Sequence, residues 1–319
     1  MNYLVTGGCG FVGSHIIRQL KRQGHTPICY DLYPHKTSIQ EVLTPEEIED
    51  LVIVQGGLDD RQFLIDTLKK YEIDKVIHLA GILGDKAEVD PYEAVKTNIL
   101  GTINMFEAAL AVGIKRVVYT SSTSVFGTEE YYAPYFGDNT IPNNAFLHPT
   151  LVYGGTKMFL EFIGNWYSEN RDLETIALRY TLVYGIARQR GSGQFATECI
   201  NKPAMGLPGI VENGDTVPDY IYVEDAARAT IIASQCPAPK TRAFVIGGER
   251  RSIRELRDYV LTLLPDADIK VLPGVYPSSY NLDLEPARLE LGYEPEYSLE
   301  EGVRTTINLI RAQQGLPPV

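Results

Sequence analysis

Cysteine is scarce in this chain, and long apolar runs are missing. Four cysteines stand far apart among 319 residues, with no CxxC pair and no histidine at metal-ligand spacing. This pattern excludes a disulfide framework and indicates no metal site. The N-terminus carries no basic segment ahead of an apolar one, and nowhere do 18 apolar residues occur together. We therefore expect an unprocessed, soluble protein of the reducing cytoplasm.

Positive charge is also in deficit. The chain has 29 Lys and Arg against 41 Asp and Glu, for a net charge of -12. Such a chain repels phosphate backbones and anionic lipid surfaces, so neither nucleic acid nor a membrane is an expected partner. Its 44% apolar and 22% charged residues are close to the globular average, which excludes disordered and fibrous proteins.

Short β-rich segments alternate with longer helical patterns over the first two thirds of the chain. This alternation predicts an α/β fold in which crossover helices join the strands of a doubly wound parallel sheet, the Rossmann arrangement. We expect a dinucleotide-binding domain in residues 1–180, with 219–248 returning to it, and a smaller interleaved substrate lobe in 181–218 and 249–319. The predicted strands are 2–6, 26–30, 51–55, 74–79, 115–120 and 173–180, and the predicted helices are 13–23, 59–71, 91–112 and 153–170.

A glycine-rich turn follows the first predicted strand. Gly8, Gly10 and Gly13 satisfy GxGxxG, and Gly7 with the last two also satisfies GxxGxxG. Glycine permits a tight turn and lets backbone N–H groups approach a pyrophosphate, although a plain turn can show the same spacing. Asp31 lies 18 residues beyond Gly13, where a carboxylate accepts hydrogen bonds from ribose hydroxyls. Its charge would repel a 2′-phosphate, which favours NAD over NADP.

Tyr153 and Lys157 stand four residues apart at the start of a predicted helix, so their side chains share one helix face. A free tyrosine titrates near pH ~10, and a neighbouring ammonium group should lower its pKa toward the working range of a base. Such a pair is also a common contact on a helix surface. Residues 120–124 add hydroxyl groups at the end of the fifth strand, where ligands bind in parallel sheets, unless these hydroxyls only cap the loop.

Together these motifs resemble the extended short-chain dehydrogenase/reductase family, which includes NAD-dependent epimerases and dehydratases of sugars. The resemblance covers nearly the whole chain, with some similarity to threonine-dehydrogenase-like members. Further matching segments lie at 78–81, 97–102, 178–185, 220–229 and 289–302.

The resemblance implies NAD as the cofactor and a secondary alcohol as the substrate. It makes Tyr153 the acid/base residue, Lys157 the residue that binds ribose and tunes the tyrosine, and Ser122 the hydroxyl that orients the substrate. It implies cofactor contacts at Gly7, Gly10, Phe11, Val12, Gly13, Asp31, Leu58, Leu79, Ala80, Gly81, Asn98, Tyr153, Lys157 and Tyr180.

Departures from the family pattern bear on the substrate. Ser122 is not followed by the Asp-Glu pair of the dehydratases, which disfavours a 4,6-dehydratase. Leu182 and Pro218 stand where nucleotide-sugar enzymes tend to place Asn and Arg. Each lost charge-assisted contact is worth ~1.5 to 3 kcal/mol, which argues against an ordinary UDP-sugar unless other basic residues replace those contacts. The candidates for that replacement are Arg188, Arg190 and Lys202.

We therefore expect hydride transfer at a secondary alcohol carbon, by an epimerase or oxidoreductase acting on a sugar or a sugar nucleotide. One-way dehydrogenation of a small hydroxy or amino acid stays open, and a non-catalytic dinucleotide-sensing protein is a remote alternative. The helices predicted at 91–112 and 153–170 carry more apolar residues than one sheet face needs. Family relatives pair these helices in a dimer, so we also expect a homodimer.

Overall fold

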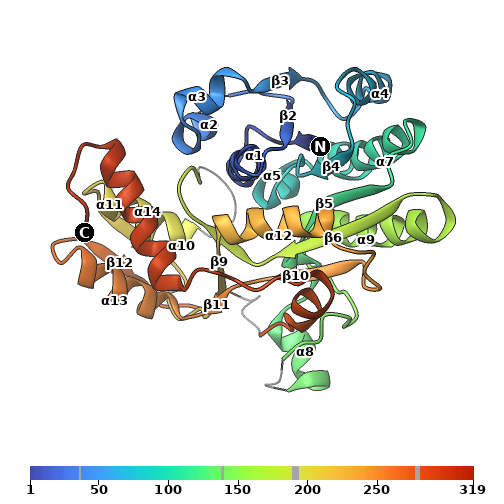
Figure 1. Ribbon diagram of the computed structural model, residues 1–319. Coiled ribbons are helices and arrows are strands. Elements are labelled where there is room, and N and C mark those ends of the chain that lie inside the picture. The colour runs from blue at the N-terminus through green and yellow to red at the C-terminus, as the bar shows by residue number, and fades with distance from the viewer. Residues whose placement is uncertain (36, 138–139, 189–193, 277–280) are drawn as a thin grey trace.

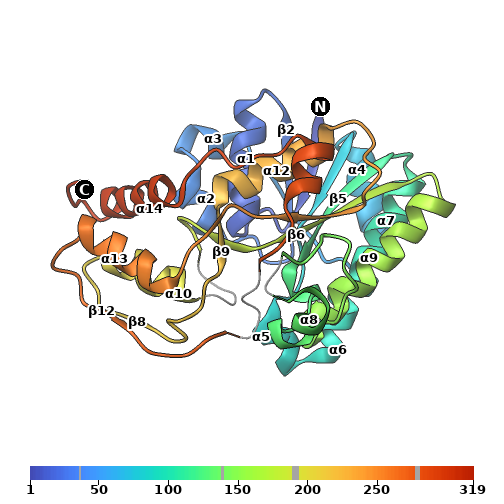
Figure 2. The ribbon, with the colours of Figure 1, turned by 90° about the horizontal axis from the view of Figure 1, so that it is seen from below.

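The computed structural model describes residues 1–35, 37–137, 140–188, 194–276 and 281–319. A seven-stranded parallel sheet with helices on both faces forms its larger part (Figures 1 and 2), so the predicted doubly wound α/β fold is confirmed. In spatial order, the strands are β10 (Ala243–Ile246), β6 (Glu174–Tyr180), β5 (Arg116–Ser122), β4 (Lys75–His78), β1 (Asn2–Thr6), β2 (Thr26–Asp31) and β3 (Val52–Gln55).

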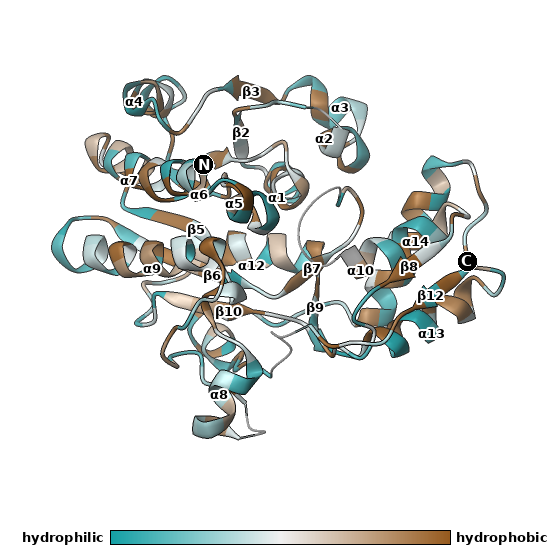
Figure 3. Ribbon diagram, turned by 180° about the vertical axis from the view of Figure 1, so that it is seen from behind, coloured by the Kyte–Doolittle hydropathy of each residue, from teal (hydrophilic) through white to brown (hydrophobic). Residues whose placement is uncertain are grey.

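The central strands are buried on both faces, as a parallel sheet covered by two helix layers requires. Four of the five residues of β1 are buried, and Figure 3 shows hydrophobic residues in brown along β5. The chain winds outward from β1 in both directions, because β1 pairs with β2 on one side and with β4 on the other. The strand order therefore reverses beside β1, which is where such folds bind ligands.

Helices on the two faces bury separate apolar clusters. On one face, α1 (Phe11–Arg22) packs against α12 (Val223–Gln235). On the other face lie α4 (Arg61–Lys70), α7 (Gly101–Ala111) and α9 (Val152–Asn170), around Phe106 and Tyr119. The observed strand and helix bounds agree with the predicted ones to within two residues, apart from the predicted helix 91–112. That segment is α6 (Pro91–Ala94), a π-helical stretch η1 (Val95–Leu100) and α7.

Several short elements were not predicted from the sequence. They are short helices within connections that were expected to be loops. Each has too few turns for apolar residues to recur at helical spacing, so the sequence pattern does not reveal it. They comprise α2 (Thr37–Val42), α3 (Pro45–Glu49), α5 (Gly84–Val89), α8 (Glu129–Phe136), α10 (Gln194–Ala196) and α11 (Lys202–Ala204), with η2 (Thr123–Val125), η3 (Thr197–Asn201) and η4 (Ala287–Leu291).

Two small sheets lie outside the large one, in the smaller part of the molecule, which also holds the C-terminal helices. One has the order β11 (Glu249–Arg250), β9 (Asp219–Tyr222), β7 (Leu182–Tyr184), and the other pairs β12 (Ile269–Val271) with β8 (Gly209–Val211). Within the segment 219–248, β9 pairs with β7 and β11, whereas β10 pairs with β6 at the edge of the large sheet.

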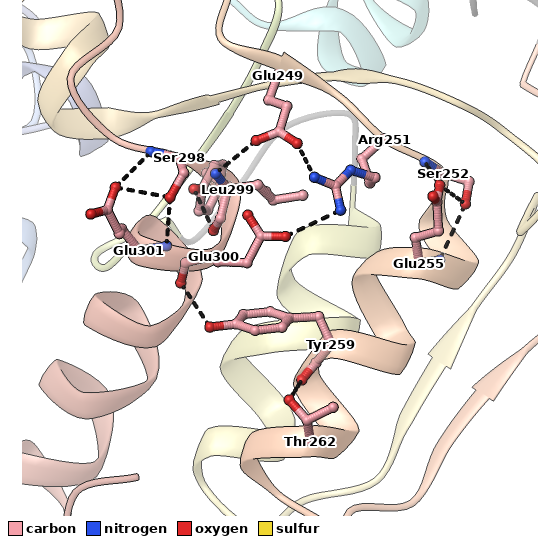
Figure 4. A network of polar contacts seen from close by, with 11 residues as sticks. Glu249, Arg251, Ser252, Glu255, Tyr259, Thr262, Ser298, Leu299, Glu300 and Glu301 are labelled. Atoms are coloured by element: carbon pink, nitrogen blue, oxygen red, sulfur yellow. Dashed lines mark hydrogen bonds and ion pairs between the residues drawn. The ribbon is translucent and has the colours of Figure 1, made fainter.

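Figure 4 shows how the helices of this smaller part are fixed. Both α13 (Ile253–Leu263) and α14 (Leu299–Gln313) begin in a capping box, in which a serine and a glutamate three residues later bond each other's backbone. Arg251 bridges Glu249 and Glu300, and the Tyr259 hydroxyl donates to the Glu300 carbonyl oxygen at 3.2 Å. These contacts tie α14 to α13 and to β11.

A buried polar network also joins α1 to α12. The Glu224 carboxylate contacts His15 and Arg18, and accepts a hydrogen bond from Gln19 Nε2 at 2.9 Å. Burial alone would raise the pKa of Glu224, but the hydrogen bond from His15 and the charges of His15 and Arg18 outweigh it and lower the pKa to about 2. None of the described helices is long and apolar enough to span a membrane.

We predict that Glu224→Gln flattens the acid dependence of stability. Because folding lowers the pKa of Glu224 from 4.5 to about 2, its contribution is complete above pH 4.5 and is lost as the pH falls through 2. The linked free energy is about 3 kcal/mol. Urea unfolding of both proteins between pH 6 and pH 2 measures it, with the exposed Glu130→Gln as control. An equally steep loss of stability in both glutamine variants would contradict the prediction.

Candidate functional site

The glycine-rich turn connects β1 to α1 at the reversal point of the strand order. Gly7 has a φ of +67°, which favours glycine, and the Gly10 N–H donates to the Gly7 carbonyl oxygen at 3.0 Å. A Cβ atom on Gly13 would collide with that carbonyl oxygen and lie 2.7 Å from Gly8 Cα. Phe11 and Val12 open α1, and its cap residue Gly10 offers no side chain to their N–H groups. These backbone donors fit an anion such as a pyrophosphate.

Asp31 ends β2 directly beside this turn. Its carboxylate accepts hydrogen bonds from the backbone N–H of Cys9 at 3.2 Å and of Tyr33 at 3.0 Å. Burial raises the pKa of Asp31, and these two bonds oppose that rise. The sulfur atoms of Cys9 and Cys29 lie 3.4 Å apart beneath the turn, and both thiols are free. The structure thus brings together the glycines and the acidic residue that sequence spacing had linked.

The segment after β4 lies against the same turn. Leu79 N–H donates to the Thr6 carbonyl oxygen at 3.1 Å, and a Cβ atom on Gly7 would lie 3.0 Å from Ala80 N. At Gly81, a Cβ atom would lie 3.0 Å from Asn98 Oδ1. Small residues here keep the backbone of this segment close to the glycine turn.

Asn98 holds this segment in place from the π-helical stretch η1. Its Oδ1 accepts a hydrogen bond from Ile82 N at 2.7 Å, and its Nδ2 donates to Ile82 O at 3.0 Å and to Thr156 Oγ1 at 3.2 Å. Leu58 is buried against Gly101 at the start of α7. Asn98 therefore ties the segment after β4 to α9, the helix that carries Tyr153.

Tyr153, Lys157 and Ser122 lie together at the C-terminal end of β5. Lys157 Nζ donates to the Thr120 carbonyl oxygen at 2.7 Å and lies 5.6 Å from the centre of the Tyr153 ring. The hydroxyl of Ser122, the last residue of β5, donates to Ser124 Oγ at 3.1 Å and lies near enough to the Tyr153 side chain to lower the pKa of its phenol. At the first turn of α9, Tyr153 N donates to Glu88 Oε1 at 3.3 Å.

The pKa of Tyr153 differs from the sequence-based expectation. Burial raises it to about 12, and the hydrogen bond from Ser122 opposes this rise without reversing it. Burial also lowers the pKa of Lys157 to about 8, against the charge of Glu161, which raises it. The lysine was expected to dominate, but desolvation penalises both charged forms in the protein without a ligand.

Other candidate residues have different surroundings. The Tyr180 hydroxyl bonds Thr230 of α12, while its backbone is paired with Ser122 in the sheet. Arg188 lies over the Phe11 ring, with 5.8 Å between the guanidinium carbon and the ring centre. Lys202 pairs with Glu198 at 2.5 Å. Arg190 lies outside the described residues.

A buried ion pair directly behind this cluster was not singled out from the sequence. Glu161 lies one helical turn beyond Lys157 on α9 and is joined to Arg179 of β6 by two hydrogen bonds. The sequence did offer one signal for this pair: Glu161 follows Lys157 by four residues, so both side chains share one face of the helix. Among the described residues, no group of three His, Cys, Asp or Glu side chains is placed to hold a metal ion.

These features define a class of protein. A doubly wound sheet, an anion-binding glycine turn and a Ser, Tyr and Lys cluster at the adjoining strand ends are the parts of a dinucleotide-dependent enzyme that moves a hydride and a proton. Residues 3–247 match the family model described as "NAD dependent epimerase/dehydratase family". The chain belongs to this NAD-dependent family.

Individual relatives cover the chain almost completely. A UDP-glucose 4-epimerase of Mycolicibacterium smegmatis is 29% identical, over 98% of this chain and 99% of the relative. A 2-alkyl-3-oxoalkanoate reductase of Stenotrophomonas maltophilia is 27% identical, over 95% of this chain and 98% of the relative. A UDP-glucose-4-epimerase of Stenotrophomonas maltophila, solved with bound NAD and formylated UDP-arabinopyranose, is 26% identical, with a TM-score of 0.84 over 99% of each chain.

We predict that Gly13→Ala weakens NAD binding at least 10-fold. The added methyl group must displace the Gly7 carbonyl oxygen, which spoils the turn that presents the backbone donors. Isothermal titration with NAD measures the loss. Gly84→Ala is the matched control, because a Cβ atom there meets nothing within 4 Å. Unchanged affinity in the Gly13 variant would show that the turn does not hold the cofactor.

Proposed function

We propose that this protein is an NAD-dependent epimerase of a sugar nucleotide, which transfers hydride at a secondary alcohol carbon. The observation that carries the proposal is the cluster of Ser122, Tyr153 and Lys157 beside the glycine turn, in a chain whose relatives include UDP-glucose 4-epimerases. The backbone of residues 7–13 would hold the pyrophosphate, and Asp31 would accept hydrogen bonds from the adenosine ribose. Leu58, Leu79, Ala80, Gly81, Asn98 and Tyr180 would complete the walls of the cofactor site.

Each residue of the cluster then has a chemical task. Bound NAD supplies the acceptor for the hydride. Tyr153, as the phenolate, removes the proton from the substrate hydroxyl, and Ser122 donates a hydrogen bond to the oxygen as it becomes a carbonyl. Lys157 binds ribose hydroxyls and favours the phenolate by its positive charge. Because burial raises the pKa of Tyr153 in the protein without a ligand, we expect the phenolate to form only once the site is loaded.

A second candidate function is one-way dehydrogenation of a small hydroxy or amino acid. It is favoured by the basic residues of the smaller part, several of which are already paired with carboxylates. Arg251 bridges Glu249 and Glu300 (Figure 4), Arg254 pairs with Asp215, and Lys202 with Glu198. Such pairs leave less charge to bind a diphosphate. One relative, a 2-alkyl-3-oxoalkanoate reductase, is named for a substrate that is not a sugar nucleotide.

The fate of the hydride separates the two functions. An epimerase returns it, so UDP-glucose and UDP-galactose interconvert while no NADH accumulates. A dehydrogenase forms NADH in proportion to product. Incubation with each UDP-sugar, or with a panel of hydroxy and amino acids, therefore decides between them when product and NADH absorbance are both recorded.

We predict that Tyr153→Phe lowers turnover at least 100-fold and keeps NAD affinity within about 3-fold of the wild type. The variant loses the proton-accepting oxygen and retains the ring that packs at the site. Steady-state kinetics and NAD titration measure the two effects. Tyr135→Phe, an exposed tyrosine of α8, is the control. Full activity of the Tyr153 variant would refute the acid/base role.

We also propose that the protein is a cytoplasmic homodimer. The outer face of α9 exposes large apolar side chains that the fold leaves uncovered, with Phe162 67% and Trp166 41% exposed, and Leu100 of η1 is 54% exposed. Exposed apolar groups at this density are typical of a subunit interface. The free cysteines suit a reducing compartment.

We predict that Phe162→Glu converts the dimer to a monomer. A charge placed on this face must be desolvated when two copies meet. Light scattering coupled to size exclusion measures the mass, and Glu169→Gln, at the solvated end of the same helix, is the control. A dimeric Phe162→Glu variant would place the interface elsewhere.

A further inference from the structure

A buried ion pair lies behind Lys157. Glu161 of α9 and Arg179 of β6 have side chains only 5% and 6% exposed. The guanidinium donates from Nε to Glu161 Oε1 at 2.9 Å and from Nη2 to Oε2 at 2.7 Å. This two-bond geometry fixes both groups, and loss of either partner would leave a buried charge without its counterion.

Further contacts hold the pair in one orientation. Ser121 Oγ donates to Glu161 Oε1 at 2.5 Å, and Arg179 Nη1 donates to the Asn143 carbonyl oxygen at 2.6 Å. Arg179 also lies over the Phe126 ring, at 5.1 Å from its centre. The three hydrogen bonds described for the Glu161 carboxylate thus come from Arg179 and Ser121, while Lys157 donates to Thr120.

The charges of this cluster do not cancel completely. Lys157 and Arg179 are cationic and Glu161 is anionic, so the three buried groups together carry one net positive charge. Because Arg179 is bound directly to Glu161, it neutralises that carboxylate, and the remaining positive charge lies on Lys157, 5.6 Å from the Tyr153 ring. Without Arg179, the carboxylate one turn away would offset the charge of the lysine.

We propose that Glu161 and Arg179 are positioning residues of the hydride-transfer site, which cancel each other's charge so that the positive charge of Lys157 acts on Tyr153. This proposal rests on the proposed function, in which Tyr153 reacts as the phenolate. In this proposal, neither Glu161 nor Arg179 contacts the substrate. Their effect passes through Lys157, which Glu161 influences from one turn along the same helix.

Several other titratable groups face this cluster. His78 on β4 is buried between the hydroxyls of Thr6 and Thr102, and its pKa is lowered to about 3, first by burial and then by the charge of Lys157. It is therefore neutral throughout the experiment. The remaining titratable groups nearby are Tyr119 on β5, Tyr132 on α8 and Glu88 on α5.

The test is a titration of Tyr153 in the NAD-loaded enzyme. Tyrosinate absorbance is recorded against pH for each protein and for the same protein with Tyr153→Phe, and the difference isolates this tyrosine. Loss of the negative charge in Glu161→Gln should lower the midpoint by about one pH unit or more, and loss of the positive charge in Arg179→Gln should raise it. The double variant should titrate close to the wild type.

A second ion pair, which joins β5 to β6, supplies the control. Arg116 and Glu174 join β5 to β6 at their N-terminal ends, where they are paired in register, opposite the end that carries Ser122. Glu174→Gln should leave the Tyr153 midpoint unchanged. Glu161→Gln keeps the shape of the side chain, so it alone decides the outcome if Arg179→Gln fails to fold.

Two results would overturn the proposal. One is a Tyr153 midpoint in Glu161→Gln equal to that of the wild type, which would mean that the pair only stabilises the fold. The other is an equal shift in Glu174→Gln. Failure of the proposed function is seen separately, as full turnover in Tyr153→Phe, because the tyrosinate titration needs no substrate.

Discussion

The hydrogen bond from Lys157 to the Thr120 carbonyl oxygen is the contact on which the arrangement of the site depends. It joins the first turns of α9 to the end of β5, and thereby sets where the Tyr153 ring lies relative to Ser122. A buried ammonium group is costly, and the hydrogen bond to this carbonyl oxygen offsets part of that cost. The position of the tyrosine thus follows from how the protein accommodates a buried cation.

The reversal of strand order beside β1 supplies the other half of the site. Because β1 pairs with both β2 and β4, the connections that leave these strands diverge at their C-terminal ends, where such folds bind ligands. The glycine turn and Asp31 lie at these strand ends, and the segment after β4 lies against the turn, fixed by Asn98. Asn98 also bonds Thr156 of α9, so one amide side chain couples the cofactor side to the Tyr153 side.

The sequence predicted the large sheet and singled out residues that the structure brings together at the candidate site, because both predictions rest on local patterns. Apolar periods mark the strands and long helices, the glycine spacing marks the turn, and the i,i+4 spacing of Tyr153 and Lys157 marks their common helix face. The sequence did not predict that β9 belongs to a separate sheet, because the residues of a short strand do not indicate which strand it pairs with. It also misjudged the pKa of Tyr153, because desolvation depends on how tertiary packing covers the ring.

The same limit explains why the Glu161 and Arg179 pair was missed. The two residues are 18 positions apart and lie on different elements, so only the packing of α9 on β6 brings them together. A buried charge cluster of this kind is expensive to assemble, and replacement by apolar residues would often stabilise a fold. The pair lies next to Lys157, which must stay charged in the proposed mechanism, and at the end of the sheet where ligands bind. An electrostatic role at the site therefore explains a buried ion pair that stability alone does not. The electrostatics of the proposed base are therefore set by residues that never meet the substrate.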